Sequence, residues 1–145
     1  MSDKYDGLKL DNQLCFPLYA VSKEVIKKYR PYLDKLGLTY TQYITMMVMW
    51  EHEKINVKDL GVELFLDSGT LTPVLKSLEQ KGYIERQRDS IDERVLNVTL
   101  TVSGQALKDR ALHIPKAVAS AINLDQKDAL ELYRILYKIL MTEQD

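Results

Sequence analysis

The chain contains little that would support disulfide bonding, membrane insertion or a general affinity for nucleic acid. Only one of its 145 residues, Cys15, is a cysteine, so no disulfide forms within the chain and a reducing compartment is expected. No apolar run approaches the ~20 residues of a membrane-spanning helix, and the N-terminus is too polar for a signal peptide. We therefore expect a cytoplasmic protein without membrane contact. The net charge is −1, so a DNA-binding chain of this composition must sort its charges onto different faces.

Signatures of enzymes and of metal sites are also missing from the sequence. There is no glycine-rich phosphate loop, no pair of carboxylates spaced for catalysis, and no histidine near Cys15 along the chain. His52 and His113 do not have the spacing of a metal site. We expect no metal, no cofactor and no enzymatic activity.

Two kinds of periodicity divide the rest of the chain. Apolar residues at helical spacing predict helices at about 11–29, 31–36, 41–52, 57–65, 69–81, 101–121 and from 125 past 140. Alternating residues predict strands at 83–88 and 95–100, joined by a polar turn at 89–93. Two helices followed directly by a hairpin form a winged helix-turn-helix, so the expected fold class is mostly α (α+β).

Individual residues set the expected helix ends and faces. Pro17 either starts the regular part of the first helix or bends its first turn, and Pro31 is expected to open a second, separate helix. The expected caps and stops are Thr41, Asp67 or Ser68, Thr101 or Ser103, Asp125, Gly37 and Gly82. The expected core of the 41–52 helix is Ile44, Met47, Val48 and Trp50. The apolar stripe of the last helix is Leu130, Tyr133, Leu136, Tyr137 and Leu140.

The helix at 69–81 has the side chains expected of an element that reads DNA. Its apolar residues form one stripe that can pack on the domain, which leaves short polar side chains, Ser77 among them, facing outward. Small hydroxyl groups near a helix N-terminus suit close entry into the major groove. The expected DNA contacts of this segment are Ser68, Thr70, Thr72, Pro73 and Lys76.

The hairpin carries three arginines that can contact DNA. Arg86 and Arg88 share a face of the first strand, and Arg94 opens the second, so guanidinium groups can reach a minor groove or phosphates. Asp92 is placed to hold Arg94 by a salt bridge. Residues 54–94 contain seven basic and eight acidic side chains, so charge alone does not distinguish a DNA-contacting wing from a solvated hairpin.

Three segments, Asp67–Pro73, Asp92–Arg94 and Leu100–Gly104, resemble the MarR family of bacterial transcription regulators. The resemblance covers nearly the whole chain, and the stretch Leu14–Tyr19 resembles the organic-hydroperoxide-sensing, OhrR-type branch with one cysteine. It implies a repressor that binds double-stranded DNA at a pseudo-palindromic operator as a homodimer and leaves it on oxidation.

The same resemblance implies how the chain is divided. The whole of 1–145 forms one winged-helix domain. The N- and C-terminal helices, about 8–36 and 103–145, form the dimerisation region, and about 54–101 form the DNA-binding region.

Cys15 is the expected redox-sensing residue. A lone cysteine in a helix is more often a buried apolar side chain, but six of the nine tyrosines lie within the first 43 residues, and phenols can stabilise a thiolate. On a continuous helix Tyr29 lies on nearly the same face as Cys15 but about 21 Å away, so the two cannot touch within one chain and could meet across a two-fold axis. The resemblance implies that Tyr29 and Tyr40 come from the partner subunit. Tyr19, inside the resembling stretch, completes the expected site.

The expected chemistry is oxidation of the Cys15 thiolate to a sulfenic acid by an organic hydroperoxide, whose apolar tail rests on Phe16, Leu18 and methionines. Without a second cysteine, the sulfenic acid condenses with a small thiol or a backbone nitrogen, or it overoxidises. A mixed disulfide would separate the Tyr29 and Tyr40 contacts and change the spacing of the two recognition helices.

Three alternatives remain at this point. The first is a MarR-type regulator released by a small phenolic or aromatic ligand, with Cys15 structural. The second is a winged helix that binds only proteins. A one-cysteine peroxidase is the weakest of the three.

Overall fold

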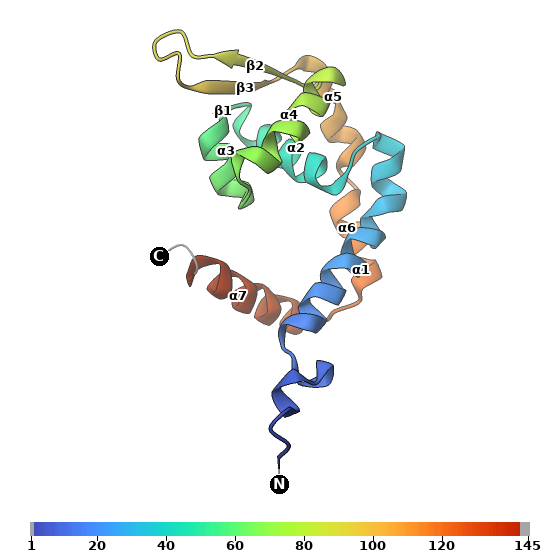
Figure 1. Cartoon of the computed structure of the whole chain (residues 1–145). Coiled ribbons are helices and arrows are strands. Elements are labelled where there is room, and N and C mark those ends of the chain that lie inside the picture. The colour runs from blue at the N-terminus through green and yellow to red at the C-terminus, as the bar shows by residue number, and fades with distance from the viewer. Residues whose placement is uncertain (1, 143–145) are drawn as a thin grey trace.

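Seven α-helices and one small antiparallel sheet make up residues 2–142, the part of the chain that the computed structural model describes (Figure 1). The helices are α1 (Cys15–Leu33), α2 (Tyr40–His52), α3 (Val57–Leu64), α4 (Ser68–Gln80), α5 (Val102–Ala111), α6 (Ile114–Ile122) and α7 (Gln126–Thr142). The strands are β1 (Lys54–Asn56), β2 (Ile84–Arg88) and β3 (Leu96–Leu100). Short 3-10 turns occupy Asp6–Leu8, Leu10–Asn12 and Asp34–Leu36. None of the helices within 2–142 is both long and apolar enough to cross a membrane.

The elements fall into two parts, which we call the head and the arm (Figure 1). The head contains α2, α3, α4, the start of α5 and the sheet, whose β2–β3 hairpin projects from one end. The arm contains α1 and α6, which pack along each other, and α7 leaves from its far end. The predicted winged helix-turn-helix is confirmed: α3 and α4 are followed directly by β2 and β3.

The sheet contains one strand that the sequence did not predict. β3 lies in the middle, paired with β2 on one side and with β1 on the other, so that Val98 faces both Arg86 and Ile55. β1 has only three residues, which is too short to give an alternating pattern. It ties the start of α3 to the base of the hairpin.

The core of the head holds α4 in place. Leu71, Leu75 and Leu78 of α4 are buried against α2, α3 and the sheet. Their buried neighbours from those elements are Met46, Met49, Leu60, Ile84 and Val98. The 3.6-residue period of α4 therefore buries one stripe and leaves its opposite face free.

The expected break at Pro31 is wrong, because α1 continues through this residue to Leu33. Pro31 lies in the last turn, where its missing N–H removes only one hydrogen bond near a helix end. The predicted stop at Gly37 is confirmed, since Gly37 adopts a left-handed conformation with φ 67°. At the other end the helix begins at Cys15, later than predicted, and Pro17 fits within its first turn.

Helix α2 begins one residue before the predicted start, because Thr39 and not Thr41 is its cap. The Thr39 hydroxyl accepts a hydrogen bond from the Gln42 N–H at 3.3 Å, and the Gln42 side chain accepts one from the Thr39 N–H at 3.1 Å. The expected core position of Met47 is also wrong: its side chain is 43% exposed, while Met46 and Met49 are buried. Neighbouring methionines on a helix point in different directions, so only two of the three can face the core.

The helix predicted at 101–121 is two helices, α5 and α6. Pro115 causes the break, because its ring clashes with the preceding turn and it has no N–H to bond the Ala111 carbonyl. The start is as predicted, with the Thr101 hydroxyl accepting from the Gly104 N–H at 3.0 Å. The predicted cap Asp125 likewise accepts from the Asp128 N–H at 2.8 Å at the start of α7.

Gly104 allows α5 to cross the base of the hairpin. The Trp50 indole donates to the Gly104 carbonyl at 2.9 Å. A Cβ at position 104 would lie 2.2 Å from the Tyr83 carbonyl oxygen and 2.7 Å from Leu100 Cδ1. Only glycine fits this approach without moving the backbone.

Gly104→Ala is therefore expected to lower the free energy of unfolding by about 1–3 kcal/mol, measured by urea denaturation. Gly7→Ala is the matched control, because a Cβ there meets nothing within 4 Å. Equal stability of the two variants would contradict the close approach.

Candidate functional site

One face of α4 gathers the residues that the sequence predicts to contact DNA. The side chains of this face are all exposed, while the opposite stripe lies in the core: Ser68, Thr70, Thr72, Pro73 and Lys76. The Asp67 carboxylate caps the helix by accepting from the Thr70 N–H at 2.7 Å, and this bond lowers the pKa of Asp67. The exposed face is thus presented by a capped helix anchored in the core.

Ser77 does not belong to this exposed face. The sequence placed it outward, but its hydroxyl accepts a hydrogen bond from the Gln42 side-chain amide at 2.9 Å, and the residue is half-buried. It lies near the C-terminal end of α4, where this helix meets α2.

At the tip of the hairpin, the predicted salt bridge between Asp92 and Arg94 is confirmed. The Arg94 Nε and Nη2 atoms donate to the two Asp92 carboxylate oxygens at 3.0 and 3.1 Å. These bonds lower the pKa of Asp92. The Arg94 side chain is 91% exposed. A bidentate pair therefore orients a solvent-facing guanidinium.

Arg86 has a different role from Arg88 and Arg94. Its guanidinium donates to Glu79 Oε1 at 3.0 and 3.3 Å, and its backbone N–H donates to Glu79 Oε2 at 2.8 Å. These bonds lower the pKa of Glu79, and the Arg86 side chain is only 20% exposed. Arg86 thus ties the hairpin to α4, while Arg88 on the same strand is exposed.

Cys15 is the first residue of α1 and is exposed. The first half of this helix has an apolar surface that the described part of its own chain does not cover. Its exposed members are Phe16, Leu18, Tyr19 and Val21, and Leu14, directly before the helix, is exposed as well. Tyr19 lies one turn after Cys15 and has the Lys23 ammonium 5.3 Å from its ring centroid.

Three tyrosines pack together at the other end of α1. The Tyr29 ring centroid lies 5.0 Å from that of Tyr40 and 5.6 Å from that of Tyr43. Burial, with the neighbouring phenols, raises the pKa of Tyr43 to about 12 and also raises that of Tyr29. The phenols therefore remain protonated at neutral pH and can donate hydrogen bonds. Sequence reasoning missed Tyr43, although its position three residues after Tyr40 places both on one helix face.

The structure separates the thiol from this tyrosine cluster within one chain. α1 is continuous from Cys15 past Tyr29. Fourteen residues at a rise of 1.5 Å give about 21 Å between them. Tyr29 and Tyr40 are brought together, while Cys15 and Tyr19 lie at the opposite end of the helix.

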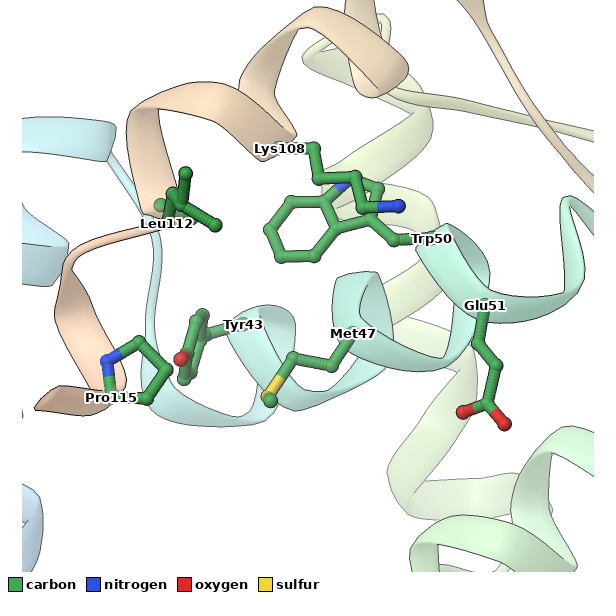
Figure 2. A pocket seen from close by; sticks show the side chains of 8 residues that line it. Tyr43, Met47, Trp50, Glu51, Lys108, Leu112 and Pro115 are labelled. Carbon is green, nitrogen blue, oxygen red and sulfur yellow. The ribbon is translucent and has the colours of Figure 1, made fainter.

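A shallow apolar groove adjoins the tyrosine cluster (Figure 2). It lies between α2 and the α5–α6 break and has a volume of about 380 Å³. Figure 2 shows Tyr43 and Met47 on one wall, facing Leu112 and Pro115 on the other. Trp50, Lys108 and Glu51 continue the lining.

The two histidines lie apart and in different surroundings. His52 contacts the Glu63 carboxylate at 2.8 Å, and His113 packs edge-on against Tyr32. Within residues 2–142, no three histidine, cysteine or acidic side chains gather in a way that could hold a metal ion.

Known families and sequences that are similar to this chain are transcriptional regulators. The family model described as transcriptional regulator SarA/Rot matches residues 27–111. The organic hydroperoxide resistance transcriptional regulator of Bacillus subtilis is 47% identical over 142 residues, which are 98% of this chain and 97% of the relative. These relatives are transcriptional regulators and not enzymes.

Comparison with solved structures adds proteins bound to DNA. Reduced AbfR bound to DNA has a TM-score of 0.80 and 34% identity, covering 99% of this chain and all of the other; AbfR is a protein of Staphylococcus epidermidis. Overoxidised AbfR bound to DNA has a TM-score of 0.74 and 36% identity, covering 95% and 99% of the two chains. A mutant MarR of E. coli in complex with operator DNA has a TM-score of 0.81 and 25% identity, covering 96% and 99%.

The turn between β2 and β3 is ordered by a carboxylate, so its order depends on pH. The Asp89 carboxylate accepts from the N–H of Asp92 at 3.1 Å, the side chain of Asn97 at 2.9 Å and the N–H of Ile91 at 3.0 Å. These bonds hold the pKa of Asp89 below its usual range. A lowered folded-state pKa means that this ordering is present above the ordinary carboxyl pKa and is lost as the pH falls through the lowered one.

The amide signals of Ile91 and Asp92 in NMR spectra are expected to shift together at that acidic midpoint. Asp89→Asn should abolish this shared titration, whereas Glu93→Gln, an equal charge change at an exposed position of the same turn, should preserve it. An unchanged titration in the Asp89 variant would show that another group orders the tip.

Proposed function

Because the chain belongs to the MarR family of transcriptional regulators, we propose that it is a redox-sensing repressor that binds operator DNA as a homodimer and is released when an organic hydroperoxide oxidises Cys15. One observation carries the proposal: an exposed thiol begins an uncovered apolar stretch of α1, and a cluster of protonated phenols lies at the opposite end of that helix. The near-full-length similarity to an organic hydroperoxide resistance regulator supports it. We assign its site of action to the cytoplasm.

The homodimer is proposed from the apolar surface that α1 and α7 leave uncovered. Monomeric proteins rarely expose contiguous apolar patches of more than about a few hundred Å². No residue of α7 in the described part of the chain is buried. Its large exposed apolar side chains are Leu130, Leu132, Tyr133, Ile135, Tyr137, Ile139 and Met141. We assign dimerisation to about 8–36 and 103–145, and DNA binding to about 54–101.

Antiparallel pairing of two α1 helices would complete the sensing site. Across a two-fold axis each thiol meets the opposite end of the partner helix, and each contact occurs twice. Cys15 and Tyr19 of one subunit would then lie beside Tyr29 and Tyr40 of the other. Phenol donors favour the thiolate over the thiol and so activate the sulfur.

The proposed reaction transfers one oxygen atom. The Cys15 thiolate attacks the terminal oxygen of the hydroperoxide, the O–O bond breaks, and the alkoxide leaves and takes a proton to become an alcohol. The resulting sulfenic acid condenses with a small thiol, which forms a mixed disulfide and releases water. These steps need only the protein, the hydroperoxide and the thiol, so we propose no cofactor.

Operator binding is assigned to α4 and the wing. The exposed face of α4 (Ser68, Thr70, Thr72, Pro73 and Lys76) would enter the major groove. Arg94, oriented by Asp92, and the exposed Arg88 would reach the minor groove or phosphates, while Arg86 holds the wing on α4. Two such heads must lie about 34–36 Å apart to read both half-sites, so a change at the dimer seam releases the DNA.

A second candidate function rests on the groove beside Tyr43. Its apolar walls and its two aromatic side chains suit a small phenolic or aromatic ligand. Such a ligand would release the DNA without any change at Cys15. The same binding assay distinguishes the two candidates.

Cumene hydroperoxide with a small thiol is expected to weaken binding of the wild-type protein to its gene's upstream DNA at least about tenfold, while Cys15→Ser keeps its affinity. Fluorescence anisotropy measures both affinities, and a dithiol reductant should restore binding of the oxidised wild type. Unchanged affinity of both proteins would favour the ligand-responsive candidate. Equal release of both would place the oxidised group elsewhere than Cys15.

Leu130→Asp is expected to raise the dimer dissociation constant at least about 100-fold, because it would bury an unpaired charge at the subunit interface. Sedimentation equilibrium measures this constant. Lys138→Gln, on the same helix, lowers the net charge by the same amount without changing an apolar residue. A monomeric wild type, or equal dissociation of the two variants, would contradict the proposed interface.

A further inference from the structure

A buried glutamine joins the start of α2 to the recognition helix α4. Gln42 is 8% exposed, and its side-chain oxygen accepts from the Thr39 N–H at 3.1 Å, closing the cap of α2. Its side-chain nitrogen donates to the Ser77 hydroxyl of α4 at 2.9 Å. One amide group therefore serves two helices that are thirty-five residues apart in sequence.

Lys81 adds a second tie between the same two regions. It is the C-cap residue of α4, and its ammonium donates to the Gly37 carbonyl and reaches the Gln42 side-chain oxygen at 3.4 Å. Gly37 ends the 3-10 turn that follows α1. The C-terminal end of α4 is thus bonded both to the α1–α2 connection and to the first turn of α2.

Both ties begin next to the tyrosine cluster. Tyr40 is the first residue of α2 and packs against Tyr29 of α1 at 5.0 Å between ring centroids. It lies between the cap residue Thr39 and Gln42 in the same helical turn. A displacement of Tyr40 therefore moves the turn to which Ser77 and Lys81 are bonded.

We propose that Gln42, Ser77 and Lys81 are positioning residues that transmit a displacement of the Tyr29–Tyr40 pair to the DNA-reading helix α4. This inference rests on the proposed redox release of the operator, and it deepens that function by naming the connection between sensor and reading head. No residue of this link touches the thiol, and none belongs to the exposed face of α4 assigned to DNA.

Hydrogen bonds suit this task better than the apolar core between the same helices. A hydrogen bond weakens steeply with distance and angle, and a buried amide that loses its partner is strongly disfavoured, so α4 follows when the first turn of α2 moves. Apolar contacts among Leu75, Leu78 and Met46 are non-directional and tolerate small sliding. Because α4 is one continuous helix, a shift near Ser77 tilts its N-terminal end, which carries Ser68, Thr70 and Thr72.

The test breaks the link without disturbing the cap of α2. Ser77→Ala removes the acceptor for Gln42, Lys81→Met removes the second tie, and the double variant removes both. Ser77→Thr keeps the hydroxyl and serves as the conservative rescue, and Gln80→Ala, at an exposed position of α4, is the matched control. Each protein is compared with itself, reduced and oxidised, so that the lost lysine charge cancels in the ratio of operator affinities.

In the double variant, cumene hydroperoxide is expected to oxidise the Cys15 thiol at the same rate as in the wild type. Mass spectrometry measures this rate. Its affinity ratio between the reduced and oxidised forms should fall about tenfold below the wild-type ratio. The affinity ratio of Ser77→Ala should lie between those of the double variant and the wild type. The ratios of Ser77→Thr and Gln80→Ala should equal the wild-type ratio. A merely structural role would instead lower both affinities and leave their ratio unchanged.

A wild-type ratio in the double variant would overturn the link while leaving the redox proposal intact. A wild type that oxidises without losing the operator would overturn the proposed function and this inference together. If the double variant does not fold, the same comparison on Ser77→Ala decides, and a ratio equal to that of Gln80→Ala overturns the link.

Discussion

The uncovered apolar half of α1 is the constraint on which the rest of the molecule depends. A helix of nineteen residues fixes the distance between its ends, so the exposed Cys15 and the packed Tyr29 remain apart within one chain. The same half-helix exposes Phe16, Leu18 and Val21 to solvent, which is unfavourable unless another surface covers them. One antiparallel contact with a second copy would remove both problems. The proposed sensing chemistry and the proposed assembly would then be a single property of α1.

The head has no excess of positive charge that could attract DNA. Its arginines are instead sorted by their acidic partners. Glu79 turns Arg86 inward and fixes the wing on α4, whereas Asp92 holds Arg94 in an exposed position. The Asp89 carboxylate accepts hydrogen bonds from two backbone N–H groups and one side-chain amide, and so shapes the turn between the strands. A count of charges along the chain could not reveal this division, because it depends on which carboxylate each guanidinium meets.

The sequence predicted the parts of the fold that local chemistry determines. The caps at Asp67, Thr101 and Asp125, the stop at Gly37 and the Asp92–Arg94 pair follow from residues within a few positions of one another. Apart from the cap of α2, which is Thr39 and not Thr41, the errors came from residues whose environment is set by distant segments. Met47 faces a groove made with α5 and α6, Ser77 meets Gln42 across two helices, and β1 exists only because β3 passes beside it. Pro31 and Pro115 show the same limit, since one is tolerated near a helix end and the other divides a helix.

Arm and head meet at a joint whose apolar and polar parts constrain different motions. Leu33, Leu36 and Leu38 are buried there and hold the two parts together, but apolar contacts of this kind set a distance more firmly than an angle. The directional bonds that reach this joint are those of Lys81, at the end of α4, to the Gly37 carbonyl and of Arg110 to the Lys35 carbonyl at 3.1 Å. Within the head, the Gln42 side chain bonds α2 to Ser77 of α4. These few hydrogen bonds therefore constrain the angle of α4 relative to the arm. In the proposed link, a small displacement at the tyrosines changes that angle without opening the core.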